Sequence, residues 1–248
     1  EDIQILREGG KRHAEILRAL AEMVTPGLST LILEEEALRL ISAHGDTPAF
    51  LNYSPKGASR PFPAALCVSI NDEIVHGIPN EKERILREED IGSLDLGLKH
   101  KGFITDSAVT VPVGAVDDES RDIMRLAREA LEAGIKAAQP GAHVGDIGEA
   151  VHKVVKGTDY SLAEDLAGHG VGFEVHEDPF VPNIGRKGEG EKLVPGMVIA
   201  IEPMVNAGDS AIADTDDGYT IVTADGSRSA HFEHTIAITE TGNIVLTR

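Results

Sequence analysis

The chain has 248 residues, of which 41% are hydrophobic, 26% are charged and only 4% are aromatic. This length and apolar content are enough for one large domain or two small ones, with a mostly aliphatic core. The formal net charge is −19, from 42 acidic and 23 basic residues. Because phosphate binding depends on clustered Lys and Arg, this balance argues against a nucleic-acid-binding surface.

A single cysteine, Cys67, excludes an internal disulfide framework and suits a reducing compartment. The first twelve residues are charged and lack the apolar core of a signal peptide. No run approaches the roughly 18 apolar residues of a membrane span. We therefore expect a cytoplasmic protein with no membrane partner.

In chain order, apolar residues near helical spacing predict a first helix over about 3–20, which stops at Thr25-Pro26-Gly27. Ser29 is placed as the N-cap of a second helix over about 30–42. A loop rich in Pro, Gly and Ser follows at about 45–63. Three short apolar segments then predict strands: 65–70, 91–98 and 102–113.

The second half begins in the same way. A long helix is predicted over 117–138, ends at Gln139-Pro140-Gly141 and is followed by another helix over about 144–156. Strands are predicted next, in four segments: 197–202, 219–223, 231–239 and 244–246.

The two halves thus share one order of elements: a helix, a Pro-Gly stop, a second helix and then strands. Because Pro-Gly is a common helix stop, a chance match is the alternative. A true repeat predicts an α+β fold with two halves, about 1–115 and 116–248, related by a pseudo-two-fold axis. The site is then expected between the halves. Because no linker separates them, we expect a single catalytic domain over 1–248.

Two aspartates lie in apolar strands where carboxylates are disfavoured. If the hairpin turns about His100-Lys101, residues whose numbers sum to 201 face each other, and Asp95 lies directly opposite Asp106. Their Cβ atoms would be about 4.5–5.5 Å apart, so the like charges repel unless a divalent cation lies between them. On spacing alone, two solvated aspartates at a hairpin edge remain an equal alternative.

Two glutamates add to this pattern. Glu202 ends the apolar run 196–201, and Glu233 stands between Phe232 and the strand that follows. A carboxylate at the end of a buried strand is costly unless it is paired or metal-bound. Each glutamate alone is also explained by a cap or a salt bridge.

His169 lies in Gly168-His169-Gly170-Val171-Gly172. Three glycines around one histidine let the backbone approach a ligand closely and position the imidazole, although a lone histidine is more often structural. Four carboxylates and one imidazole form an oxygen-rich donor set. Such a set suits Mn²⁺, Fe²⁺ or Co²⁺ better than a thiolate-type structural zinc site.

These residues, in this order, resemble the methionine aminopeptidase family, whose fold is called pita-bread. The similarity runs over almost the whole chain and includes flanking motifs: 67–73, 75–79, 201–204 and 233–235. The resemblance implies a mostly antiparallel, curved sheet covered by helices. It also implies two divalent ions, Co²⁺, Mn²⁺ or Fe²⁺, held by the family's ligand set: Asp95, Asp106, His169, Glu202 and Glu233.

By the same resemblance, Glu202 is also the proton shuttle. His76 and His176 would contact the substrate and the tetrahedral intermediate. Cys67 would line the pocket for the first side chain, and Tyr219 stands where an aromatic residue closes it. From the residues alone, a turn-filling His76 and a solvated His176 on a strand are the simpler interpretations.

The implied activity is metal-dependent removal of the initiator methionine from nascent proteins and peptides when the second residue is small, by a monomer. Two segments depart from the family pattern: 172–179 is closer to the Xaa-Pro peptidases, and the pocket-forming loop 52–63 matches poorly. A Xaa-Pro aminopeptidase or dipeptidase of the same fold is therefore the alternative. A catalytically inactive peptide-binding relative is disfavoured, because all five ligands are present.

Overall fold

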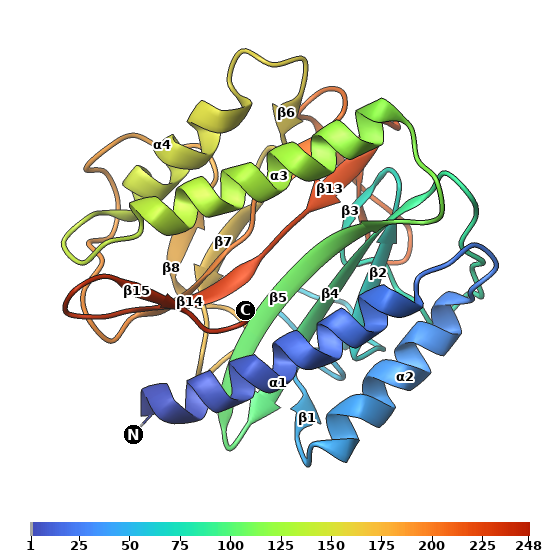
Figure 1. The fold of residues 1–248 in the computed structure, drawn as a ribbon, viewed down its shortest axis with the longest axis horizontal. Helices are drawn as coiled ribbons and strands as arrows, with labels where there is room; N and C mark the ends of the chain where they lie inside the picture. Colours follow the sequence, from blue (N-terminus) through green and yellow to red (C-terminus); the bar gives the residue numbers. More distant parts are fainter. Residues whose placement is uncertain (1) are drawn as a thin grey trace.

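The structure is a computed structural model and describes residues 2–248. The helices within this range are α1 (Asp2–Met23), α2 (Thr30–Ala43), α3 (Asp118–Ala137) and α4 (Val144–Val155). These bounds confirm the helices expected from the sequence. Ser29 caps α2 by accepting a hydrogen bond from the Leu31 N–H, and Asp117 caps α3 by accepting one from the Ser120 N–H. Figure 1 shows α1 and α3 lying across the strands, with α2 and α4 beside them.

In the first half of the chain, β4 (Ile91–His100) is the centre of an antiparallel sheet. One edge of β4 pairs along its length with β5 (Phe103–Pro112), and the other pairs with β2 (Leu66–Ile70) and the short β1 (Thr47–Pro48). Helix α1 packs on β4 and β5. The cluster buried between helices and sheet is aliphatic and includes Ile16, Leu20, Leu33, Leu66, Leu94 and Leu96.

In the second half, five antiparallel strands form a sheet in the order β15-β14-β9-β7-β8. Their bounds are β7 (Ala167–Gly170), β8 (Glu177–Pro182), β9 (Val198–Ile201), β14 (His234–Ile238) and β15 (Asn243–Val245). Helix α3 packs on α4, and α4 packs on β8. Apolar residues on α3, such as Ile123 and Leu131, are buried in a second aliphatic cluster with Ile199 and Ile236.

Two small antiparallel sheets complete the fold, in the orders β13-β10-β6 and β11-β12-β3. Their bounds are β3 (Glu73–Val75), β6 (Ser161–Leu162), β10 (Met204–Asn206), β11 (Ile212–Asp214), β12 (Ile221–Thr223) and β13 (Ser229–His231). Strand β3 pairs with β12, so a strand from the first half of the chain is joined to one from the second. This pairing brings both halves to the region of the site.

The predicted register of the β4–β5 hairpin is wrong. Asp95 lies opposite Ala108, and Asp106 lies opposite Gly97. The chain reverses one residue later than expected, at Lys101 and Gly102, which have φ of 47° and 94° as a tight two-residue hairpin turn requires. Because the shift of the pairing is two residues rather than one, both aspartates still point to the same face of the sheet, as diagonal neighbours.

The single strand predicted over 231–239 is also wrong, because the structure has two strands, β13 and β14, on either side of Phe232 and Glu233. At this break the Glu233 N–H donates to the Ala108 carbonyl at 3.0 Å. Glu233 is thereby tied to β5 in the other half of the chain.

The antiparallel sheets and covering helices confirm the α+β class. Within residues 2–248, none of the helices combines the length and hydropathy that a membrane crossing requires. The assignment of the whole chain to one catalytic domain with two pseudo-repeat halves stays a prediction.

Candidate metal centre and substrate pocket

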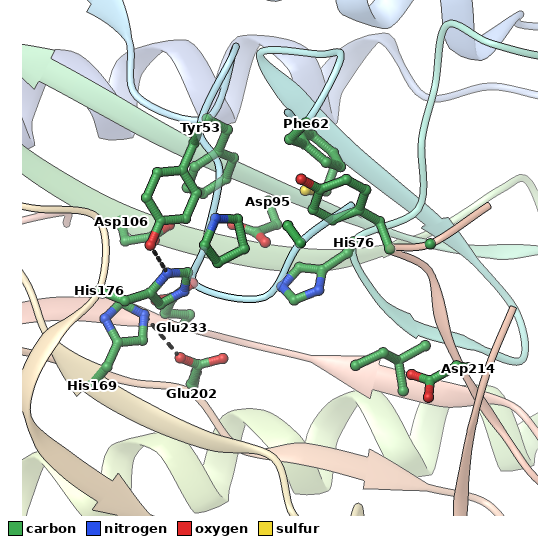
Figure 2. A pocket seen from close by; sticks show the side chains of 17 residues that line it. Tyr53, Phe62, His76, Asp95, Asp106, His169, His176, Glu202, Asp214 and Glu233 are labelled. Carbon is green, nitrogen blue, oxygen red and sulfur yellow. Dashed lines mark hydrogen bonds and ion pairs between the residues drawn. The ribbon is translucent and has the colours of Figure 1, made fainter. Parts of the chain in front are cut away.

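A cavity of about 250 Å³ contains all nine residues that the sequence analysis placed in the site. Figure 2 shows the acidic and histidine side chains around one space, with aromatic rings on one side of it. The predicted residues in its lining are Cys67, His76, Asp95, Asp106, His169, His176, Glu202, Tyr219 and Glu233. The structure therefore brings together residues that are up to 166 positions apart in the chain, from Cys67 to Glu233.

The acidic residues come from both halves. Asp95 and Asp106 project from the same face of the β4–β5 hairpin. Glu202 directly follows β9, and Glu233 lies in the break between β13 and β14. His169 is on β7, where the pairing with β8 shifts register between Gly168 and Gly170.

The glycines beside His169 have a different role from the one expected. A Cβ atom at Gly170 would lie 2.0 Å from the Asp178 carbonyl oxygen, and one at Gly168 would lie 2.3 Å from the Ala200 carbonyl oxygen. Neighbouring strands, rather than a ligand, therefore require glycine at these positions. The glycines still act on the site, because they let β7 lie close enough to β8 and β9 for His169 to reach the carboxylates.

All four carboxylates are buried, with exposed fractions of 7% for Asp95, 3% for Asp106, 9% for Glu202 and 2% for Glu233. Burial raises the pKa of Glu202 to about 8 and that of Asp95 to about 6. Burial, reinforced by the neighbouring carboxylates, raises the pKa of Asp106 and Glu233 well above the ordinary values. Without a cation, these groups therefore resist ionisation.

The donor atoms fit a divalent cation. One oxygen each of Asp95, Asp106 and Glu233 is buried without a hydrogen-bond partner among the described residues. Ligand atoms of Asp106, His169 and Glu233 lie within 4.8 Å of one another. Unpaired buried carboxylate oxygens around one point are costly unless a cation binds them. Oxygen donors with one imidazole suit Mn²⁺, Fe²⁺ or Co²⁺.

His169 presents one ring nitrogen to this centre. Its Nδ1 lies 2.9 Å from the Gly170 carbonyl oxygen, which only accepts hydrogen bonds, so Nδ1 carries the proton. Nε2 is then left with its lone pair and lies 3.3 Å from Glu202 Oε1. Burial lowers the pKa of His169 to about 3, so the ring is a neutral donor to a cation at physiological pH.

The other two predicted histidines border the same space. His176 lies just before β8, with its ring edge-on to His169 at a centroid distance of 4.4 Å and its Nδ1 2.9 Å from the Tyr53 hydroxyl. His76 follows β3 with a left-handed φ of 61°. Burial lowers the pKa of His76 to about 4. His176 keeps an exposed side chain, and partial desolvation by the surrounding residues lowers its pKa as well. Strained backbone at a cavity-lining histidine is typical of functional sites.

The apolar side of the cavity includes aromatic residues that the sequence analysis missed. Phe50, Tyr53 and Phe62 lie in or beside the loop that matches the family poorly. Phe62 packs edge-on against Tyr219 at 5.1 Å, and the Tyr219 hydroxyl donates to the Arg60 carbonyl. The sequence did contain an indication of these pocket residues. Three aromatic residues lie within 13 positions of a chain that is only 4% aromatic.

Cys67 lies in β2 directly opposite Asp95 and is 2% exposed. Burial and the nearby carboxylates raise the pKa of its thiol well above the ordinary value. Cys67 is therefore a neutral, soft lining group rather than a nucleophile.

A fourth histidine, next to the carboxylates, was also missed. His231 ends β13 and is 1% exposed, with Nε2 at 3.5 Å from Glu202 Oε2 and 3.9 Å from Glu233 Oε2. Its place two residues before Glu233 was the available signal, because residues two apart on a strand lie on the same face.

The family follows from comparison with known proteins. The model of metallopeptidase family M24 matches residues 4–240. The methionine aminopeptidase of Aquifex aeolicus is 44% identical, over 99% of this chain and 96% of the relative, and methionine aminopeptidase 1 of Bacillus subtilis is 42% identical, over 100% and 96%. The crystal structure of methionine aminopeptidase from Thermotoga maritima superposes with a TM-score of 0.94 at 40% identity, covering 100% of this chain and 96% of that one.

The chain therefore belongs to metallopeptidase family M24 and, within it, to the methionine aminopeptidases. This confirms the predicted family, the pita-bread fold and the aminopeptidase class. Prolidase from Pyrococcus furiosus superposes with a TM-score of 0.75 at 23% identity, and the match covers 100% of this chain and 64% of the prolidase chain. That likeness shows a shared fold alone, so the Xaa-Pro alternative gains no support beyond the fold.

Proposed function

We propose that this protein removes the N-terminal methionine from nascent proteins and peptides whose second residue is small. The observation that carries the proposal is a single cavity in which an apolar wall of Phe62, Cys67 and Tyr219 faces a cluster of buried carboxylates. An unbranched thioether suits a wall of this kind, because it is flexible and makes favourable contacts with aromatic rings and sulfur. The methionine aminopeptidase relatives support the same substrate.

The residues that would hold two divalent ions are Asp95, Asp106, His169, Glu202 and Glu233. Ions bound there would supply Lewis acidity and lower the pKa of a coordinated water. The donor set favours Co²⁺, Mn²⁺ or Fe²⁺. We further propose that the protein acts as a cytoplasmic monomer.

The chain's own groups account for the remaining chemistry. Glu202 borders the cavity and takes the proton of the attacking water, then delivers it to the leaving amine as a general base and acid. His76 and His176 are neutral near pH 7, so each can donate a hydrogen bond to the developing oxyanion. The free α-amino group of the substrate would bind an ion held by the acidic cluster or a nearby carboxylate, which restricts cleavage to a chain terminus.

Space for the rest of the substrate lies next to the cavity. A second hollow of about 540 Å³ shares four lining residues with it: His76, His169, His176 and Glu202. A peptide whose first side chain fills the apolar cavity can therefore continue past these histidines. A small second residue is favoured, because the chain must pass between them.

The test is kcat/KM for Met-Gly-, Met-Leu-, Leu-Gly- and Ala-Pro-type peptides on one preparation, stripped of metal and reloaded with Mn²⁺, Co²⁺ or Fe²⁺. We expect Met-Gly peptides to be the best substrates. Leucine should be disfavoured by only about 1–3 kcal/mol, since an apolar pocket discriminates weakly between similar side chains. Stripped protein should be inactive. If Ala-Pro peptides are cleaved best, the Xaa-Pro assignment replaces this one.

A further inference from the structure

His231 is held rigidly at the acidic end of the cavity. Its N–H donates to Thr110 Oγ1 at 2.8 Å, and its carbonyl accepts from the same hydroxyl at 2.8 Å. On the other side, β13 pairs with β10, placing His231 opposite Met204. The backbone of His231 is thus fixed by both halves of the chain, so its side chain has little freedom to turn away from the carboxylates.

The ring of His231 is buried without the partners that such a ring normally has. Neither Nδ1 nor Nε2 makes a hydrogen bond to any residue in 2–248. By contrast, buried His13 lies 3.0 Å from the Thr105 hydroxyl, and buried His100 lies 2.6 Å from an Asp46 oxygen. An unpaired buried polar group is costly, so its presence in a native fold calls for a partner in the working state.

The nearest polar atoms identify that partner. His231 Nε2 faces Glu202 Oε2 at 3.5 Å and Glu233 Oε2 at 3.9 Å, and an ionised carboxylate can only accept. The other Glu202 oxygen, Oε1, faces His169 Nε2. Glu202 therefore lies between two imidazoles, one for each of its oxygens.

We infer that His231 is a positioning residue that donates a hydrogen bond from Nε2 to Glu202 Oε2 and holds this carboxylate with Oε1 directed at the ligand set. The role rests on the proposed function, because Glu202 is the residue that moves the proton there. His231 acts through Glu202 and does not itself touch the substrate. Such outer hydrogen bonds typically contribute 10–100-fold to metal affinity or activity.

The decisive variants are His231→Gln, which keeps an N–H donor at similar reach, and His231→Leu, which keeps the volume but removes the donor. His231→Asn supplies a second test that is polar but too short to reach Glu202. His13→Leu is the matched control, because it removes a buried imidazole outside the cavity. For each variant we would measure kcat and KM on a Met-Gly peptide, the number of Mn²⁺ ions bound per chain, and the visible spectrum with Co²⁺.

With His231→Leu and His231→Asn, kcat should fall by about 10–100-fold while KM and the number of bound ions stay close to wild type. His231→Gln should recover most of kcat, and His13→Leu should retain it. The Co²⁺ spectrum should change with Leu and Asn but not with Gln. Melting curves identify a variant that fails to fold, and whichever of the Leu and Asn variants folds then decides alone.

Equal kcat in His231→Leu and wild type, or equal loss in His231→Gln and His231→Leu, would overturn the inference. Fewer bound ions in the Leu variant at saturating Mn²⁺ would overturn it too, because His231 would then be a metal ligand. Failure of the proposed function has a different signature, in which wild-type protein does not cleave Met-Gly peptides at all. The Co²⁺ spectra of the four variants still decide the role of His231 in that case.

Discussion

Removing the metal should make the stability of this protein fall as the pH rises from 7 to 8.5. Burial raises the pKa of Glu202 from 4.5 to about 8, so the metal-free folded chain keeps a proton on Glu202 that the unfolded chain has already lost. A proton bound more tightly by the folded state stabilises it, and that contribution is lost as the pH passes through the folded pKa. Buried histidines oppose this change. His13, His76, His169 and His234, with pKa values of about 3 to 4 in the folded chain, each regain about 0.15 kcal/mol between pH 7 and pH 8.5, because about a quarter of the unfolded imidazoles are still protonated at pH 7.

The magnitude follows from the pKa of Glu202. A group with a folded pKa of about 8 contributes about 1.4 kcal/mol at pH 7 and about 0.2 kcal/mol at pH 8.5, a loss of about 1.2 kcal/mol. Asp106 and Glu233, whose pKa values are also raised, change the stability in the same direction. For a domain of this size, each kcal/mol shifts Tm by about 2–4 °C, so the Glu202 contribution corresponds to about 2–5 °C. It is measured as the difference between wild type and Glu202→Gln, in which the histidine contributions cancel.

The assay is thermal unfolding of chelator-treated and Mn²⁺-loaded protein at pH 7 and pH 8.5. A bound cation keeps the carboxylates ionised, so the loaded protein should not show the fall and should gain more from metal at the higher pH. Glu202→Gln is the control, since metal-free protein with this change should lose less stability over the same range. An equal change of Tm between pH 7 and pH 8.5 in metal-free wild type and metal-free Glu202→Gln would refute the reasoning.

Three further predictions concern single residues. Glu202→Gln should lower kcat by roughly 10²–10⁴ without unfolding the protein, and wild-type turnover with metal bound would assign the base elsewhere. Gly77→Ala should destabilise the fold by about 1–3 kcal/mol in urea unfolding, because the new Cβ would lie 2.3 Å from a β2 carbonyl oxygen and displace the segment that carries His76. Tyr53→Phe removes the hydrogen bond to His176, and the loss of about 1 kcal/mol should lower kcat/KM by about fivefold, with a fall in Tm of no more than about 4 °C. An unaltered kcat/KM would show that His176 is oriented without this hydroxyl.

The local parts of the fold were readable from the sequence, because their causes are local. The cap at Ser29 and the Pro-Gly stops depend on a few adjacent residues, so the helix bounds predicted from them are confirmed within a few positions. Carboxylates in apolar strands, such as Asp95, could also be identified from the sequence as candidate site residues, because a charged group in a buried strand is unfavourable. The nine predicted site residues do line one cavity, while their individual roles stay predictions.

Contacts between distant segments decided the rest. The turn at Lys101-Gly102 set a register two residues away from the predicted one, and pairing of the Glu233 N–H with β5 split a strand that the apolar pattern left continuous. The sequence pattern did not distinguish His231 from the other strand residues, because its surroundings are formed by both halves of the chain. Buried carboxylates and the motifs around them were recognisable in the sequence, because residue type and spacing are local properties, and the resemblance of these motifs indicated the family. Which of the groups touch, and at what distance, depends on backbone pairing between segments far apart in the chain, and the sequence does not contain that pairing in any local pattern.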